Sequence, residues 1–528
     1  MSSLRILFVS HEASLTGAPL ILLHIIRHLR DEHGVEPYVV IRASTGDIRL
    51  EPFLELAPVW CAWEKQPADW PTSFDLIYSN TVTNGIFIER LRSRGTPVLT
   101  HVHELSDSIL AYGRNNLTCV LRQTSRFIAC SPSVQFHLLH NFAIAESDLS
   151  MVPEFINARR IDRMINSEDT DPGSLITAMG SDFVIGAAGW ASYRKGTDLF
   201  VNLLQSLPES IHGRRISLAW VGGNFDSFRS ALSPELQARV FAVGPQPNPF
   251  PFFQRFDVFA MTSREDPFPL VMLENAYLSR PIVGFIGSGG FDDLVAADAA
   301  YGVQMLNVGR LAHTITMLAS NTALAARLGA KARHVVEAFL DEKALPQIWS
   351  AVQATLSAPV QVERKFPDSI FSTVLDARLN PTTLGSACLY FGPGEAYTLR
   401  AAYDRTASAA FEFVIPPKES DVHVRFDPDF VPGIFDFIHL SVTDSEGTLL
   451  FRQGDSDGWD KIQVGGTSRV LSSGKSLKIA SHGVDPQIIL PAIHANGRAL
   501  IFRCEMNSSC CGTELGLAVQ SLLTHPSP

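Results

Sequence analysis

The first 165 residues alternate short apolar runs with amphipathic segments. The run LRILFVS at 4–10 precedes a glycine-bearing turn, HEASLTGAP, and then a segment, LILLHIIRHLRDEHG, whose apolar residues recur at helical spacing. Further strand-like runs follow at 36–42, 75–80, 97–103 and 126–131. Strand–helix alternation at this spacing predicts an α/β domain with a parallel, doubly wound sheet over residues 1–165.

The same pattern begins again after a polar seam near residues 160–180. Residues 182–207 repeat the order of strand, glycine turn and helix, and strand-like runs follow at 216–223, 238–244, 257–263 and 280–285. A helical stretch at 323–357 closes this half. We therefore predict a second Rossmann-like domain over residues 166–358, in tandem with the first.

Helical periodicity is lost in residues 365–528, where strand-like runs alternate with turn clusters. The sequence DSEG between HLSVT and TLLFRQ is typical of a hairpin turn. We predict a separate all-β sandwich domain here. Its aromatic residues, Trp459 among them, are expected mainly to fill a core, although Trp459 beside a Gly/Asp-rich loop could also stack on a sugar ring.

Composition narrows the class of protein. The formal net charge of −11 argues against a nucleic-acid-binding protein, which would need a basic domain. The seven cysteines form no C-x-x-C pair or zinc spacing, so a reducing compartment is the simplest interpretation. Apolar runs are too short for a signal peptide or a spanning helix. We expect a cytoplasmic protein, and peripheral contact with the inner face of a membrane stays open.

Two glycine turns are candidates for phosphate binding, because parallel sheets bind ligands at the carboxyl ends of their strands. Gly17 lies in the first turn, where a purely structural turn is about as plausible. The second turn, GWASYRKGTD, places Arg194 and Lys195 beside Gly196 at an expected helix N-terminus. Two cations and free N–H groups form a diphosphate site without metal, although a solvent-facing pair of cations is the alternative.

Two other segments carry polar residues at strand ends. In THVHE, at 100–104, His101 and His103 point the same way along a strand, and we expect one core histidine and one functional histidine. In REDPFPLVMLENAYLSRPIVG, at 264–284, Asp266 precedes an expected helix at 270–278 and Glu274 lies about one turn inside it. Carboxylates there suit a polyhydroxyl, phosphate-bearing ligand, but they also suit an ordinary capped helix.

Taken together, these segments resemble family four of the glycosyltransferases, the retaining enzymes with the GT-B fold, over residues 1–358. In that family an E-x7-E element follows a Ser-bearing strand end and precedes a P-V/I-V run. Here the element is TSREDPFPLVMLENAYLSRPIVG, with Asp266 where the first Glu usually stands and Glu274 as the second. The change from Glu to Asp shortens the reach of the side chain by one methylene.

The resemblance implies roles for particular residues. Gly17 would lie against the donor phosphates, His103 by the donor sugar at the reacting face, and Arg194 and Lys195 on the diphosphate. Asp266 would contact sugar hydroxyls, helped by the backbone N–H groups of Phe268, Leu270 and Val271. Glu274 would hold the ribose, and the turn near Gly244 would meet the base. The SPSV segment at 131–134 is a weaker phosphate candidate.

The predicted function is a metal-independent, retaining transfer of a sugar from a nucleotide-sugar donor to a glycan or lipid-linked glycan acceptor, in surface polysaccharide synthesis of the O-antigen or capsule type. No cofactor is expected, and the D-x-D strings at 427–429 and 455–457 are expected to be turns, not metal sites. Three alternatives stay open: a GT-B-fold sugar-nucleotide epimerase, a phosphorylase, and a non-catalytic glycan-binding scaffold. The all-β domain could hold a glycan, mediate oligomerisation or dock onto a partner enzyme.

Overall fold

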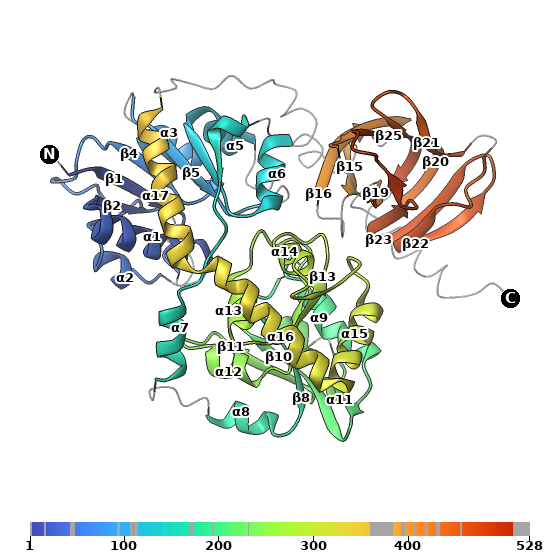
Figure 1. The fold of residues 1–528 in the computed structure, drawn as a ribbon, viewed down its shortest axis with the longest axis horizontal. Coiled ribbons are helices and arrows are strands. Elements are labelled where there is room, and N and C mark those ends of the chain that lie inside the picture. The colour runs from blue at the N-terminus through green and yellow to red at the C-terminus, as the bar shows by residue number, and fades with distance from the viewer. Residues whose placement is uncertain are drawn as a thin grey trace. The chain divides into compact units, whose positions relative to one another are not determined.

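The computed structural model describes residues 3–510, apart from 15–16, 43–47, 92–94, 106–108, 110–113, 141, 143, 168–172, 193, 231, 359–383, 392–396, 405–407, 418–420, 429–432 and 455–456. The chain divides into two compact units (Figure 1). The first contains both parallel sheets, and the second contains residues 367–528.

The first sheet is parallel and has the strand order β3-β2-β1-β4-β5-β6-β7. Its strands are β1 Arg5–Ser10, β2 Glu36–Ile41, β3 Val59–Cys61, β4 Leu76–Ser79, β5 Val98–Val102, β6 Arg126–Ala129 and β7 Leu149–Met151. The central strands are buried on both faces, as expected for continuous apolar strands of a parallel sheet that helices cover on both sides. The order reverses beside β1, which is where an open α/β sheet binds its ligand.

The second sheet repeats this topology in the order β11-β10-β8-β12-β13-β14. Its strands are β8 Phe183–Ala188, β10 Arg214–Val221, β11 Val240–Gly244, β12 Val258–Met261, β13 Ile282–Phe285 and β14 Tyr301–Val303, and a short β9, Ser210–Ile211, pairs with β10. Here the switch point lies at β8. The ends of β8 and β12 therefore form the natural ligand edge of this domain.

Helices connect the strands of both domains. Their bounds are α1 Gly17–His33, α2 Glu51–Leu54, α3 Gly85–Leu91, α5 Arg114–Gln123, α6 Pro132–His140, α7 Ala158–Ile165, α8 Gly173–Met179, α9 Thr197–Ser206, α10 Asp226–Ser230, α11 Pro234–Gln237, α12 Phe250–Arg255, α13 Leu270–Tyr277, α14 Phe291–Ala296, α15 Val308–Ser320, α16 Thr322–Val336 and α17 Asp341–Ser357.

The last helix of the first unit, α17, belongs to the core of the first domain. The sequence pattern placed its residues with the second half, but Leu345, Ile348 and Val352 are buried in the cluster that also contains α1 and β1 residues. Figure 1 shows α17 alongside the N-terminal elements. The chain therefore passes between the domains twice, and the two passages pair through Ile156 and Leu340.

The second unit is an antiparallel β module. Its main strands are β15 Leu384–Phe391, β16 Tyr397–Asp404, β17 Ala409–Ile415, β19 Val424–Asp427, β20 Gly433–Asp444, β21 Leu449–Gly454, β22 Gln463–Ser473, β23 Leu477–Ile489 and β25 Leu500–Cys510, and β18 Asp421–Val422 pairs with β24 Ile493–His494. The main strands join in one nine-stranded sheet, with the order β16-β15-β19-β23-β20-β25-β17 along its path.

This sheet folds over its own core. The rings of Phe411 on β17 and Phe426 on β19 have centroids 5.4 Å apart, although three strands separate β17 from β19 in the sheet. A flat sheet would separate them by about 19 Å, at ~4.8 Å per strand. The ends of the sheet must therefore face each other, so the predicted fold class is confirmed: two Rossmann-like domains and an all-β domain.

Trp459 of the β module is buried, so packing accounts for it. The side chains of Asp427 and Asp457 are each ion-paired with an arginine, Arg425 and Arg452 respectively. An arginine partner neutralises each of these two carboxylates. Asp457 lies in a turn, where its N–H donates to the Gly454 carbonyl, but Asp427 is the last residue of strand β19, so the expectation of a turn is wrong for that residue. Asp429 and Asp455 lie outside the described residues.

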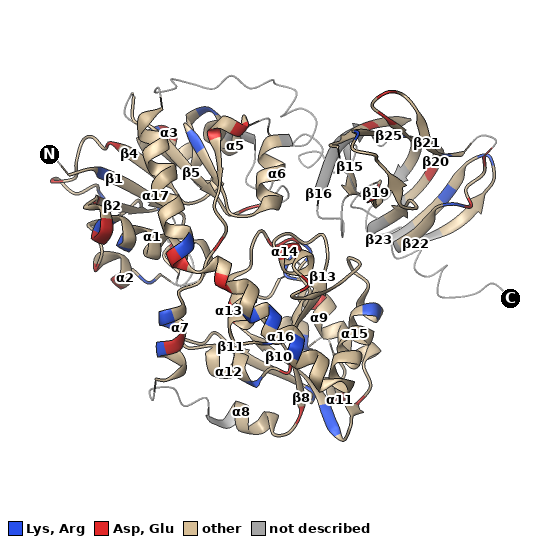
Figure 2. Cartoon of the chain, in the orientation of Figure 1, with Lys and Arg blue, Asp and Glu red and all other residues tan. Residues whose placement is uncertain are grey.

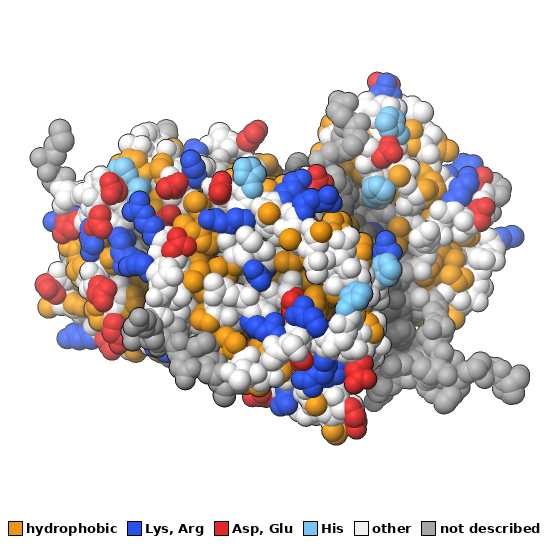
Figure 3. Space-filling view, turned by 60° about the horizontal axis from the view of Figure 1, so that its bottom comes forward, with side chains coloured by type: hydrophobic (Ala, Val, Ile, Leu, Met, Phe, Trp, Pro, Cys, Tyr) orange, Lys and Arg blue, Asp and Glu red, His pale blue; other side chains and the backbone are white. Residues whose placement is uncertain are grey.

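Five cysteines, Cys61, Cys119, Cys130, Cys388 and Cys504, are buried free thiols. In the described part of the chain, every helix is too short or too polar to cross a bilayer. Figure 2 shows both signs of charge on α7, and Figure 3 shows basic side chains interspersed with acidic and apolar ones.

Candidate functional site

The turn after β8 is built around Gly196, which immediately precedes α9. Its φ of 62° lies in the left-handed region, and a Cβ at this position would lie 1.7 Å from the carbonyl oxygen of Thr262. Only glycine allows the turn to approach the end of β12 so closely. The approach brings the preceding residues, Arg194 and Lys195, against the segment that follows β12.

Lys195 and Asp266 form a buried ion pair at this contact. Lys195 Nζ lies 2.6 Å from Asp266 Oδ2, and only 15% and 7% of the two side chains are exposed. Arg194 is more exposed; its guanidinium donates a hydrogen bond to the carbonyl oxygen of Glu265 and lies 3.8 Å from Asp266 Oδ1. The three residues named from the sequence therefore lie together at one strand edge, with two cations around one carboxylate.

Burial and charge oppose each other in this pair. Burial favours the neutral acid, but the charges of Lys195 and Arg194 hold the pKa of Asp266 below its usual value. Burial also lowers the pKa of Lys195, an effect that Asp266 counteracts and Arg194 reinforces. The site therefore carries a surplus of positive charge, which suits an incoming anion.

The segment after β12 is fixed from both sides. Arg264 forms a two-point ion pair with Asp198 in the first turn of α9, with N–O distances of 2.7 and 2.8 Å. The Ser263 hydroxyl donates to Asp266 at 3.2 Å, and the Asp266 N–H donates to the carbonyl oxygen of Ser288. Asp266 is thus held by backbone and side-chain contacts before any ligand arrives.

Glu274 lies one turn inside α13, which runs from Leu270 to Tyr277 as the sequence indicated. Burial raises the pKa of Glu274 to about 7, and the nearby charge of Arg160 only partly offsets this effect. Within the described part of the chain, its carboxylate has no hydrogen-bond or ion-pair partner. A buried carboxylate of this kind is ready to accept hydrogen bonds from ligand hydroxyls.

The start of α13 is anchored by Phe268, which is buried with its ring 5.2 Å from that of Phe339. Leu270 and Val271 open the helix, so their N–H groups are among those without an intrahelical acceptor. The first turn of α13 therefore has free N–H groups, and their contact with a donor sugar stays a prediction.

His103, just after β5, has a partner on each ring nitrogen. Nδ1 is hydrogen-bonded to Glu154 and Nε2 lies 3.1 Å from Asn80 Oδ1. Burial alone would lower the pKa of His103, but the charge of Glu154, its hydrogen bond and the charge of Glu104 raise it above the usual value. The ring is therefore fixed between two oxygen partners.

His101 is a core residue. It is buried, its Nδ1 lies 2.8 Å from the Tyr78 hydroxyl, and its ring centroid lies 4.0 Å from that of His103. His101 and His103 lie on the same side of the chain because they are two residues apart, and side chains alternate along a strand. His101 is thus the core histidine of the expected pair, and the functional role expected of His103 stays a prediction.

Gly17 and Gly244 both have positive φ, 55° and 75°. Gly17 opens α1, and the neighbouring Ala18 carbonyl accepts a hydrogen bond from the Asn80 side chain, which links this turn to His103. Gly244 ends β11 and its carbonyl accepts from the N–H of Gly222. The Ser131 hydroxyl of the SPSV segment accepts from the Val134 N–H and so caps α6.

Sequence reasoning missed two partners of the site. Glu154 follows the edge strand β7 in MVPEF, and Arg160 lies on α7; neither belongs to a pattern that the sequence analysis used. The only feature of the sequence that could have indicated Glu154 is its position as a single carboxylate at the end of a short apolar run. The pairing itself depends on the parallel neighbours β5, β6 and β7, which bring distant residues together.

His103, Cys130 and Glu154 form a cluster whose ligand atoms lie within 4.8 Å of one another. His103 and Glu154 already bond to each other, and burial keeps the pKa of the Cys130 thiol well above its usual value. The thiol is thus a poor metal ligand at neutral pH.

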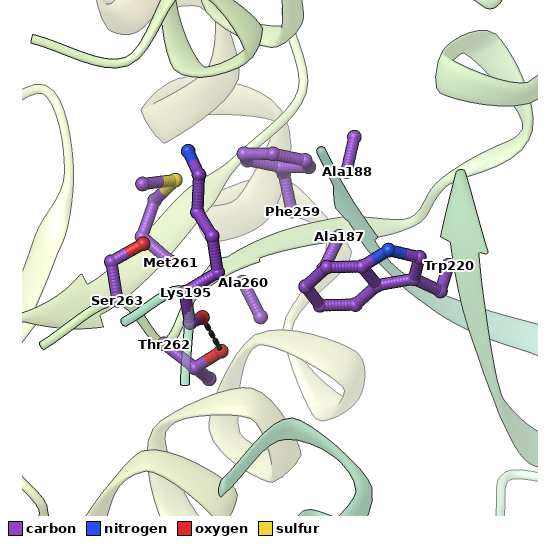
Figure 4. A pocket seen from close by; sticks show the side chains of 9 residues that line it. All are labelled: Ala187, Ala188, Lys195, Trp220, Phe259, Ala260, Met261, Thr262 and Ser263. Carbon is purple, nitrogen blue, oxygen red and sulfur yellow. Dashed lines mark hydrogen bonds between the residues drawn. The ribbon is translucent and has the colours of Figure 1, made fainter. Parts of the chain in front are cut away.

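A small pocket lies beside Lys195, between the ends of β8 and β12 (Figure 4). Lys195 and Trp220 stand on opposite sides of it, and the Lys195 carbonyl accepts a hydrogen bond from the Thr262 hydroxyl. The pocket is mostly apolar, lined by Ala187, Ala188, Phe259, Ala260 and Met261 besides the polar Thr262 and Ser263.

Comparison with known proteins agrees with this geometry. Residues 177–335 match the family model described as glycosyl transferases group 1. The lipopolysaccharide core biosynthesis mannosyltransferase LpcC of Rhizobium leguminosarum bv. viciae is 25% identical over 197 residues, which cover 36% of this chain and 56% of LpcC.

Solved structures share the fold of the first unit. HepE from Anabaena, in complex with UDP-glucose, aligns with a TM-score of 0.55 and 21% identity over 66% of this chain and 99% of its own. A glycosyltransferase from Rickettsia africae aligns with a TM-score of 0.51 and 17% identity, over 68% and 100%. The resemblance drawn from the sequence is confirmed: residues 177–335 carry a group 1 glycosyltransferase domain, and the first two domains have the GT-B fold.

Proposed function

We propose that this protein is a metal-independent, retaining glycosyltransferase that moves a sugar from a nucleotide-sugar donor to a glycan acceptor. The observation that carries the proposal is the cluster of Arg194, Lys195 and Asp266 at the switch point of the second sheet. The cluster supplies two cations that would suit a diphosphate and a carboxylate that would suit sugar hydroxyls, and the helix that follows it in the chain, α13, carries the buried Glu274.

The donor's diphosphate would bind Lys195 and Arg194. The Lys195–Asp266 bond holds the ammonium in place before the ligand arrives, so little conformational entropy is lost on binding. The sugar hydroxyls would then reach Asp266, and the ribose hydroxyls would reach Glu274, which has no protein partner among the described residues.

The chemical step breaks the bond between C1 of the sugar and the phosphate oxygen. The departing diphosphate gains negative charge, and Lys195 and Arg194 are fixed where that charge develops. Preorganised groups of this kind usually provide the largest part of catalysis, and losing one typically costs about 3–4 kcal/mol. No metal is required by this scheme.

Retention follows if the acceptor hydroxyl attacks the face that the diphosphate leaves. The acceptor oxygen then bonds to C1, and its proton passes to the departing phosphate oxygen, so that no separate general base is needed. The negative charges of Glu154 and Glu104 raise the pKa of His103 and so favour its cationic form, which would stabilise negative charge close to the reacting face.

The relatives suggest a class of product. LpcC is named as a lipopolysaccharide core mannosyltransferase, and HepE is described with UDP-glucose. We infer that this chain acts in the synthesis of a surface polysaccharide of the O-antigen, capsule or lipopolysaccharide type, with a glycan or lipid-linked glycan acceptor at the cytoplasmic face of a membrane.

A thermal-shift screen with UDP-, GDP- and dTDP-sugars, followed by NMR of the products, tests the proposal. We expect one donor class to raise the melting temperature, and the transferred sugar to keep its anomeric configuration. Conversion of a donor without acceptor would instead identify an epimerase, and stabilisation without turnover on any acceptor would identify a binding scaffold. An inverted product would contradict retention.

A further inference from the structure

Trp190 is the most exposed of the large hydrophobic side chains in the described part of the chain, with 68% of its surface accessible. It lies in the turn between β8 and α9, five residues before Lys195. Single exposed hydrophobic residues are common on protein surfaces and need no explanation by themselves. The way this one is held distinguishes it.

The backbone on both sides of Trp190 is fixed. The Gly189 N–H donates to the carbonyl oxygen of Val221, and the Ala191 N–H donates to that of Gly223, both at 2.9 Å. The Asn224 side chain also donates to the Ala191 carbonyl at 2.9 Å. The indole therefore projects from a rigid turn, so that little freedom would be lost when a ligand contacts it.

The six-membered part of the indole lies against Gly223. A Cβ at Gly223 would lie 2.6 Å from Cζ3 of Trp190, closer than real side chains approach. The glycine thus makes room for the ring, which rests on the backbone after β10 and leaves most of its surface to solvent.

The indole ring and the Lys195 side chain point in opposite directions along the row of strand ends. The sheet order is β11-β10-β8-β12, and the ring leans from β8 toward β10, whereas Lys195 reaches from the same turn toward Asp266 after β12. Gly244, at the end of β11, is joined to Gly222 by a backbone hydrogen bond. Trp190 therefore lies on the β11 side of Lys195, opposite the sugar-binding side.

We propose that the indole ring of Trp190 is the platform on which the base of the donor nucleotide stacks. This inference rests on the proposed function, because it takes the diphosphate on Lys195 and the sugar at Asp266 as its reference. A donor extended along the edge then carries its base toward Trp190 and Gly244. The planar, apolar face of an indole can stack on any nucleobase, because every base has a flat aromatic face.

Binding measurements with and without the base separate this role from others. The probes are UDP, GDP and dTDP, and inorganic pyrophosphate, which lacks the nucleoside. The variants are Trp190→Ala, Trp190→Phe and, as a matched control, Trp63→Ala, which removes another exposed tryptophan, from the segment after the edge strand β3 of the first domain.

We expect Trp190→Ala to weaken binding of the preferred nucleoside diphosphate by about 5- to 150-fold, since a base stacked on an aromatic ring contributes ~1–3 kcal/mol. Trp190→Phe should retain part of this affinity, and Trp63→Ala all of it. Pyrophosphate should bind wild type and both Trp190 variants within about twofold of one another.

Three results would overturn the inference. Equal nucleotide affinity in wild type and Trp190→Ala removes the ring from the base site. An equal loss for nucleotide and pyrophosphate assigns Trp190 to the shape of the turn, and a change confined to the acceptor KM assigns it to the acceptor. A wild-type protein that binds none of the nucleotides would instead refute the proposed function, together with this inference.

Discussion

At the scale of single residues, the site depends on carboxylates whose protonation is set by burial. Glu274 has a pKa of about 7 in the folded protein, above the ordinary value of 4.5, because its carboxylate is buried with only partial compensation from Arg160. The folded state therefore holds a proton that the unfolded state has released between these two pH values. The contribution of Glu274 to the free energy of unfolding therefore falls as pH rises from 4.5 to about 7.

Replacing Glu274 with Gln should remove this dependence. We expect the wild type to lose about 3 kcal/mol relative to Glu274→Gln between pH 4.5 and 8, because each unit of pKa shift corresponds to ~1.4 kcal/mol. Calorimetric unfolding of the first unit at several pH values measures the difference. Parallel pH profiles for the two proteins would show that Glu274 is not the titrating group.

The Lys195–Asp266 pair makes a second prediction at this scale. Asp266→Ala leaves a buried ammonium without its partner and should destabilise the first unit by about 3–5 kcal/mol, whereas the double variant Lys195→Ala/Asp266→Ala should cost less than the single one. Thermal unfolding of the wild type, Asp266→Ala, Lys195→Ala and the double variant completes the double-mutant cycle. Additive losses would show that the two side chains do not interact.

Residue identities indicated much of the site, and topology determined the rest. Arg194, Lys195, Asp266 and Glu274 could be named because each lies in a local pattern of strand end, glycine turn and helix start. Glu154 reaches His103 only because β5, β6 and β7 are parallel neighbours. No spacing along the chain carries that information.

At the scale of elements, α17 shows the same limit. Its amphipathic pattern correctly predicts a helix over these residues. Periodicity shows which face of the helix is apolar, but it does not show which domain that face packs against. The structure places that face on the first domain, so α17 ties the second passage of the chain to the N-terminal core.

Ile348 tests this packing. It is fully buried on α17 within the N-terminal cluster, and Ile348→Ala should destabilise the first unit by about 2–5 kcal/mol through the lost contacts and the cavity left behind. Chemical denaturation followed by circular dichroism measures the loss. Substitution of the exposed Met317 on α15 by Ala is the control, and an equally small effect at both positions would contradict the assignment of α17 to this core.

At the scale of the whole molecule, the β module and the two Rossmann-like domains are separate compact units. The proposed donor residues all lie in the first unit, so a chain ending at residue 366 should keep the nucleotide affinity of the full chain. Isothermal titration of both proteins makes the comparison. A truncated chain that folds, as judged by circular dichroism, but has lost nucleotide binding would show that the β module contributes to the donor site.

The fold of the whole molecule followed from the sequence because strand–helix alternation and strand–turn alternation occupy different stretches of the chain. The role of the β module did not, because most of its aromatic side chains that the structure describes, Phe411, Phe426 and Phe502 among them, are buried in its core. Surface chemistry, not core pattern, would be needed to name its partner.

The central claim is that fixed cations of the second domain hold the diphosphate of a nucleotide-sugar. Isothermal titration of the full chain and its Lys195→Ala variant with UDP, GDP and dTDP tests it most directly. We expect one nucleotide to bind the wild type, and Lys195→Ala to weaken that binding at least about tenfold, or ~1.4 kcal/mol. Equal affinity in the two proteins, or no binding of any nucleotide to the wild type, would contradict the account.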